Sequence, residues 1–190
     1  MPIEPAGRRI SGRLLRTLVL VGMPGAGKSA VGRTLAARLK VPIRDSDAEI
    51  VSRARSSIAE IFERHGEAFF RDRERAVIAS LLEGPPAVLS TGGGAWLSTE
   101  NRELISEHAA VLWLRADLEL LWSRVKHRDT RPLLRTPDPK ATLAELLEVR
   151  TPAYATAPLS LEVRAEWSIE QTSDAVMAEL IAAGVIEPDR

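Results

Sequence analysis

The stretch Gly22-Met23-Pro24-Gly25-Ala26-Gly27-Lys28-Ser29 has the residue types and spacing of a phosphate-binding loop, G-x-x-x-x-G-K-[ST]. Glycines let the backbone turn sharply and point its N–H groups at an anion. The side chain of Lys28 can reach the β- and γ-phosphates of a nucleotide, and the Ser29 hydroxyl can coordinate Mg²⁺. The motif therefore predicts a nucleoside triphosphate site formed by Gly22, Gly25, Ala26, Gly27, Lys28, Ser29 and Ala30.

Two carboxylates, Asp45 and Asp47, follow the short apolar run 41–43. On a strand, a spacing of two residues places both side chains on one face. One carboxylate could then hold Mg²⁺ through water while the other contacts a hydroxyl-bearing acceptor. The alternative is that Asp47 caps the following helix, since Asp is a favoured N-cap residue. Beside a phosphate-binding loop we favour the functional interpretation.

The run Thr91-Gly92-Gly93-Gly94 is unusual after an apolar strand. Three glycines weaken a strand, so a close approach of the backbone to another group is the natural explanation. A simple tight turn is the alternative. Because the nucleotide has its own loop, we expect the N–H groups of Gly92, Gly93 and Gly94 to meet the acceptor.

Three arginines are candidates for binding anions. The basic run 126–135 is short, lacks aromatic residues and belongs to a chain of zero net charge, which argues against nucleic acid. It favours a mobile lid at about 126–139 that brings Arg131 onto the phosphates. Residue types alone favour a structural role for Arg71, as an i,i+3 partner of Glu74. For Arg150, near a helix end, they leave carboxylate binding and solvent exposure equally open.

The elements that would position these residues alternate along the chain. Apolar runs predict strands at 17–21, 41–47, 87–90, 109–114 and 159–163, and helical spacing predicts helices at 30–39, 48–55, 67–82, 101–107, 117–126, 143–149 and 168–180. Capping patterns start at Ser57 and Ser168. The alternation predicts an α/β fold with a five-stranded parallel sheet flanked by helices. Ligands bind beyond the carboxyl ends of such strands, so the motifs at 22–29, 45–47 and 92–94 should face one crevice.

Length and composition limit the class of protein. The 190 residues favour one domain at 17–190 preceded by a flexible arm at 1–16. The chain has no cysteine, which excludes disulfides and fits a reducing compartment. It has no apolar run long enough to cross a membrane, and no secretory signal. We therefore expect a cytoplasmic monomer that binds neither membrane nor nucleic acid.

Taken together, these residues resemble the shikimate kinase family over about 17–180. The resemblance rests on the phosphate-binding loop, Asp45-Ser46-Asp47, the motif at 70–74, the triple glycine, Arg131-Pro132-Leu133-Leu134, and Arg150 with Tyr154 four residues later. The segment Thr151-Pro152-Ala153-Tyr154 departs from the family, which more often has Pro-Leu-Tyr there.

The resemblance implies a three-layer, nucleoside-monophosphate-kinase-like P-loop fold with a mobile lid. It implies ATP- and Mg²⁺-dependent phosphorylation of the 3-hydroxyl of shikimate, a step in chorismate and aromatic amino-acid biosynthesis. By resemblance, Asp47 binds the shikimate hydroxyls and acts with Lys28 and Arg131 in catalysis. The resemblance also implies that Arg71 and Arg150 bind the carboxylate of shikimate, that the backbone of Gly93 contacts shikimate, and that Phe62 and Phe70 form walls of its pocket. It further implies that Asp45 and Ser29 bind Mg²⁺ and that Arg124 contacts the adenine.

Two other functions remain open on the same fold. One is a different small-molecule kinase, such as a gluconate kinase. The other is a non-catalytic sensor that binds a ligand, although the intact phosphate-binding loop and lid arginine argue against it.

Overall fold

The computed structural model describes residues 11–126 and 136–189. Its centre is a five-stranded sheet in the order β3-β4-β2-β5-β6, in which every neighbouring pair is parallel. The strands are β2 (Leu18–Val21), β3 (Ile43–Asp45), β4 (Val88–Ser90), β5 (Ala110–Arg115) and β6 (Leu159–Glu162). The predicted five-stranded parallel sheet is confirmed. All four residues of β2 are buried, as expected of a strand covered on both faces.

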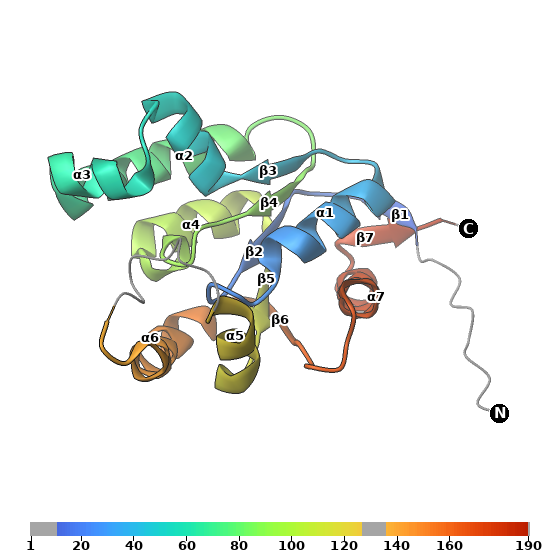
Figure 1. Ribbon diagram of the computed structural model, residues 1–190. Coiled ribbons are helices and arrows are strands. Elements are labelled where there is room, and N and C mark those ends of the chain that lie inside the picture. The colour runs from blue at the N-terminus through green and yellow to red at the C-terminus, as the bar shows by residue number, and fades with distance from the viewer. Residues whose placement is uncertain (1–10, 127–135, 190) are drawn as a thin grey trace.

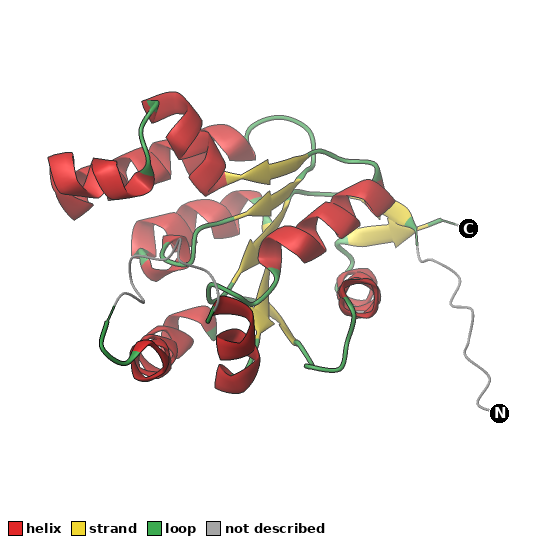
Figure 2. Ribbon diagram, viewed as in Figure 1, coloured by secondary structure: helices red, strands yellow, loops and turns green. Residues whose placement is uncertain are grey.

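Helices cover both faces of the sheet (Figures 1 and 2). The helices are α1 (Lys28–Leu39), α2 (Ser46–Ala54), α3 (Ile58–Leu82), α4 (Thr99–His108), α5 (Leu118–Val125), α6 (Pro139–Tyr154) and α7 (Ile169–Ala182), with a 3₁₀ turn η1 (Ala95–Leu97). On one face α1 packs against α7, and on the other α4 packs against β5 and α3. Helices α2 and α3 pack together beyond the edge strand β3, and α5 packs against α6. This layering surrounds the carboxyl ends of the strands with helix termini and loops.

Gly66 divides α3, because its φ of 80° and ψ of 176° are not helical. The capping pattern at Ser57 and the separate helix predicted at 67–82 indicate two helices here, and the structure confirms the break between them. The first begins with a capping box, in which Ser57 Oγ accepts from the Glu60 N–H (3.2 Å) and Glu60 Oε2 accepts from the Ser57 N–H (2.7 Å).

The prediction of a flexible arm at 1–16 is wrong for residues 12–14. Gly12–Leu14 forms β1, which pairs antiparallel with β7 (Ile186–Pro188) at the other end of the chain. Residues 1–10 lie outside the described residues. No local pattern indicates this pairing, because the two strands lie more than 170 residues apart along the chain. Arg13 of β1 and Glu187 of β7 form an ion pair across the two strands.

Several helix boundaries differ from prediction, and two of these differences involve site residues. Helix α2 begins at Ser46 rather than at residue 48, so Asp47 lies inside its first turn. Helix α6 continues past Arg150 to Tyr154, although Pro152 lacks an N–H. Its last turn is held by Trp96, whose Nε1 donates to the Ala153 carbonyl (3.0 Å), and by the burial of Tyr154.

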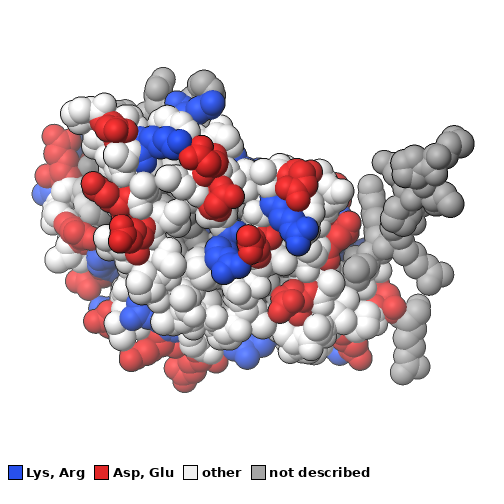
Figure 3. All heavy atoms as spheres, turned by 90° about the horizontal axis from the view of Figure 1, so that it is seen from below, with Lys and Arg blue, Asp and Glu red and all other residues white. Residues whose placement is uncertain are grey.

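Charges of both signs are intermingled on the described atoms of the face in Figure 3, in keeping with the formal net charge of zero. Within 11–126 and 136–189, no helix is both long and apolar enough to cross a membrane.

Candidate active site

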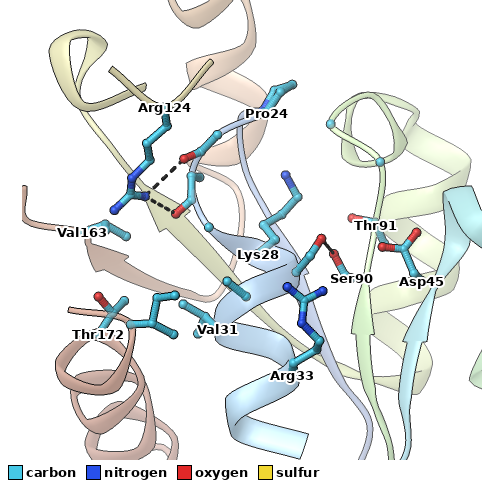
Figure 4. Close-up of a pocket in the computed structure, with 18 of the residues that line it drawn as sticks. Pro24, Lys28, Val31, Arg33, Asp45, Ser90, Thr91, Arg124, Val163 and Thr172 are labelled. Atoms are coloured by element: carbon cyan, nitrogen blue, oxygen red, sulfur yellow. Dashed lines mark hydrogen bonds between the residues drawn. The ribbon is translucent and has the colours of Figure 1, made fainter. Parts of the chain in front are cut away.

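A cavity of about 540 Å³ opens at the carboxyl ends of the parallel strands (Figure 4). Its walls come from the phosphate-binding loop, the start of α1, and the segments that follow β3, β4 and β6. The lining residues are Pro24, Gly25, Ala26, Gly27, Lys28, Ser29, Ala30, Val31, Arg33, Asp45, Asp47, Ser90, Thr91, Gly92, Gly93, Arg124, Val163, Ile169 and Thr172. The three motifs predicted to face one crevice therefore do so.

The phosphate-binding loop has the backbone that its glycines predict. Gly22 has φ 139°, and a Cβ there would lie 2.7 Å from the Leu114 carbonyl oxygen of β5, so only glycine fits. Helix α1 begins at Lys28, and its N-cap residue, Gly27, has no side chain with which to cap the helix. Its first N–H groups are thus left for an anion. Lys28 Nζ donates to the carbonyls of Gly22 (2.7 Å) and Met23 (3.1 Å), which places its charge over the same loop.

Arg124 closes one wall of the cavity. Its Nη1 donates to the carbonyls of Gly25 and Ala26 (3.2 Å each), and burial lowers its pKa. In Figure 4, Arg124 and Val163 lie opposite Asp45 and Thr91, with Lys28 between the two walls. Val163 was missed by sequence reasoning, although it directly follows β6 and the strand-end rule could have found it.

Asp45, and not Asp47, caps α2: its Oδ1 accepts from the Ala48 N–H (3.0 Å). The prediction that both carboxylates lie on one strand face is wrong, because Asp47 belongs to the first turn of α2. They reach the cavity from the end of a strand and from the first turn of a helix.

The donors near Asp45 suit Mg²⁺. Ser29 Oγ lies 3.4 Å from Ser90 Oγ, and both residues line the cavity with Asp45. Mg²⁺ beside a nucleotide typically uses one or two carboxylates together with hydroxyls, waters and phosphate oxygens. Within the described part of the chain there is no cluster of three or more His, Cys, Asp or Glu that could hold a metal ion. Asp45 and Ser29 are thus the candidate metal ligands.

The pKa of Asp47 is raised, mainly because burial disfavours its charge and secondarily because Asp45 is close. The charges of Lys28 and Arg71 oppose this effect. A carboxylate whose pKa is raised is a better proton acceptor than an ordinary one.

The triple glycine is explained by close contacts on three sides. A Cβ added to Gly92 would lie 2.5 Å from Oδ1 of Asp47. One added to Gly93 would lie 3.0 Å from Cδ of Pro24 and 3.4 Å from Nη1 of Arg150. One added to Gly94 would lie 2.8 Å from Nη2 of Arg71. The loop thereby brings the carboxylate and both arginines of the predicted acceptor site together, from α2, α3 and α6.

Arg71 is held by a buried carboxylate. Its Nη1 lies 2.8 Å from Oε2 of Glu74, which is only 1 % exposed. Burial raises the pKa of Glu74, and the ion pair with Arg71 opposes that rise. The predicted i,i+3 pair is confirmed. Asn101, whose Nδ2 lies 3.4 Å from Glu74 Oε2, was missed because only the tertiary structure brings α4 to α3.

Other predicted site residues border the triple glycine or a second hydrophobic cluster between α2 and α3, which contains Phe70 and has Phe62 packed against it. The cavity lining given above does not include Arg71, Arg150, Phe62 or Phe70. The rings of Phe62 and Phe70 lie 4.5 Å apart, and Arg71 Cζ lies 5.2 Å from the Phe70 ring centroid. Arg131, the predicted lid arginine, lies outside the described residues, as does most of the predicted lid.

Comparisons with known proteins point to one family. The family model for shikimate kinase matches residues 24–182. A shikimate kinase of Ruegeria pomeroyi is 64% identical over 167 residues, which cover 88% of this chain and 86% of that protein. A shikimate kinase of Cereibacter sphaeroides is 52% identical, with 96% of this chain and 92% of that protein covered. The structure of Acinetobacter baumannii shikimate kinase in complex with shikimate has a TM-score of 0.82 and 36% identity, and covers 90% of this chain and 94% of that one.

Proposed function

The chain belongs to the shikimate kinase family, and on that premise we propose that it transfers the γ-phosphoryl group of ATP to the 3-hydroxyl of shikimate. The observation that carries the proposal is the triple glycine, which brings Asp47, Arg71 and Arg150 together beside the phosphate-binding loop. A small hydroxy acid needs a cationic clamp for its carboxylate and an acceptor for its reacting hydroxyl. Two arginines and one aspartate supply both.

At the nucleotide end, the loop N–H groups and the N-terminus of α1 bind the phosphates, and Lys28 neutralises charge on the β- and γ-groups. Arg124, which donates to two carbonyls of the loop, would lie against the adenine. Arg131 would complete the charge compensation from the lid. Asp45 and Ser29 would hold Mg²⁺, which supplies further neutralisation of the transferring group when bound.

At the acceptor end, Arg71 and Arg150 would grip the carboxylate in the bidentate manner that suits guanidinium groups. The Gly93 backbone contacts the acid, and the Phe62–Phe70 pair walls the pocket. Asp47 would orient the reacting hydroxyl and accept its proton, a role that its raised pKa supports. Phosphoryl transfer mainly requires such positioning and charge neutralisation.

ADP release tests the proposal. With Mg·ATP, we expect strong release with shikimate and background release with gluconate or no acceptor. Release with gluconate alone would indicate a gluconate-type kinase. ATP binding without release for either acid would indicate a ligand sensor, and both results would overturn the proposal.

We also propose that the enzyme is a monomer in the cytoplasm. Within 11–126 and 136–189 only five large apolar side chains are exposed, whereas an obligate dimer interface usually presents a large contiguous apolar patch. These residues are Leu15, Ile43, Val51, Val149 and Ile169. Light scattering at working concentration gives the mass directly.

A further inference from the structure

Tyr154 is the single tyrosine of the chain, and its side chain is completely buried at the end of α6. Its ring stacks on Trp113 of β5, with centroids 6.0 Å apart and planes 24° apart. A buried phenol needs a partner for its hydroxyl. That partner lies in the acceptor site.

The Tyr154 hydroxyl donates to the carbonyl of Gly93, the central glycine of the triple-glycine loop. The Arg150 guanidinium lies near the same peptide, because a Cβ on Gly93 would be 3.4 Å from Arg150 Nη1. Arg150 and Tyr154 are four residues apart in one helix, so their side chains share a face. One phenolic oxygen thus stands between the loop and the clamp arginine.

The two clamp arginines are held by groups of different charge. Arg71 pairs with the carboxylate of Glu74, whereas within 11–126 and 136–189 no carboxylate forms an ion pair with Arg150. A carboxylate partner cancels part of the positive charge that attracts an acidic ligand. The neutral Tyr154 phenol is the side-chain hydrogen-bond partner of Arg150 and leaves the charge of the arginine intact.

We propose that Tyr154 is a positioning residue that locks the Gly93 peptide and the Arg150 guanidinium in register for the carboxylate of the acceptor. The inference rests on the proposed function and deepens it. Burial raises the pKa of Tyr154, against the influence of Arg150, so the phenol keeps the proton that it donates to Gly93. Trp113 also borders the phosphate-binding loop, because a Cβ added to Gly22 would lie 3.3 Å from Cδ1 of Trp113. The Trp113–Tyr154 stack therefore lies next to the nucleotide site.

The test is Tyr154→Phe, which removes one oxygen and keeps the ring on Trp113. It leaves the partly buried Gly93 carbonyl without this donor and frees Arg150, so we expect the KM for shikimate to rise about tenfold. We expect kcat to fall less and the KM for ATP to stay within about twofold of wild type. The matched control is Thr151→Val, because the Thr151 hydroxyl donates inside α6, to the Leu147 carbonyl (2.6 Å), and not to the triple-glycine loop. This variant should keep both KM values.

A second readout uses the wild-type chain and does not depend on the variant folding. With ¹³Cζ-labelled tyrosine, the single resonance should shift when shikimate is added without nucleotide, and should not shift with gluconate. A Tyr154→Phe enzyme with wild-type KM for shikimate, or an unmoved resonance, would overturn the role of Tyr154 while ADP release by wild type still supports the kinase. A variant with lowered melting temperature and kcat but unchanged KM would make Tyr154 purely structural. A wild-type enzyme inactive with shikimate would remove the proposed function and this inference together.

Discussion

Replacing Gly92 with alanine should disable the acceptor site without unfolding the protein. The new Cβ would lie 2.5 Å from Asp47 Oδ1, whereas ordinary contact begins at 3.4 Å. The carboxylate must therefore retreat by about 0.9 Å. Misplacing a reacting group by about 1 Å can cost roughly 100-fold in rate, which corresponds to about 2.7 kcal/mol of transition-state stabilisation.

The backbone gives no reason for unfolding, because the φ of Gly92 is not in the left-handed region. We expect a melting temperature close to wild type, a KM for ATP within about twofold, and a kcat/KM for shikimate about 100-fold lower. The matched control is Gly94→Ala, whose Cβ would first meet the end of the Arg71 side chain, 2.8 Å away at Nη2. A long side chain can rotate aside, so this variant should mainly raise the KM for shikimate.

A double-mutant cycle with Asp47→Asn isolates the mechanism. If Gly92→Ala acts through Asp47, the double variant should be only slightly slower than Asp47→Asn alone. ADP release at saturating Mg·ATP provides all four rates. A full further loss of about 100-fold in the Asp47→Asn background, or wild-type activity of Gly92→Ala, would refute the reasoning.

Three further predictions follow from the described contacts. The pKa of Asp47 is raised in the folded protein, so this carboxyl group favours folding below its ordinary pKa, and that contribution is lost as the pH rises through the raised pKa. Asp47→Asn should therefore be more stable to urea than wild type at pH 7 but not at pH 4. The same variant should lose about 100-fold or more in turnover. Equal urea midpoints at pH 7 would contradict the burial argument. Asp45→Asn keeps an acceptor for the Ala48 N–H and Asp45→Ala does not, so only the alanine variant should lose about 1 kcal/mol in unfolding, while both need more Mg²⁺ for half-maximal rate. Gly22→Ala would bring a Cβ within 2.7 Å of the Leu114 carbonyl oxygen, so it should lower the melting temperature and weaken the binding of a fluorescent ATP analogue. A wild-type melting temperature with wild-type affinity would contradict this prediction.

Much of the fold could be predicted because its signals are local. The apolar run of β2, the glycines of the phosphate-binding loop and the capping box at Ser57 each act within a few residues of chain. The alternation of strands and helices then requires a parallel sheet, and the strand-end rule places the site. The family was recognisable for the same reason, since its motifs are short and ordered along the chain.

Local signals also failed at particular residues. Either Asp45 or Asp47 could cap α2 by type, and the choice depends on where β3 leaves its neighbour β4. The helical continuation to Tyr154 depends on Trp96, a residue of the segment after the triple glycine. Both the pairing of β3 with β4 and the contact of Trp96 with α6 join segments that are far apart in the sequence, so a short window of sequence does not reveal them.

The sequence by itself determined the phosphate-binding chemistry, the class of fold and the family, because backbone conformation and apolar periodicity are set by neighbouring residues. Only the tertiary structure decided the strand order, the pairing of β1 with β7, and which side chain meets which glycine. These depend on packing between groups far apart along the chain, such as Tyr154 and Gly93, whose hydrogen bond spans 61 residues. Such contacts form only when the sheet has brought its loops to one edge.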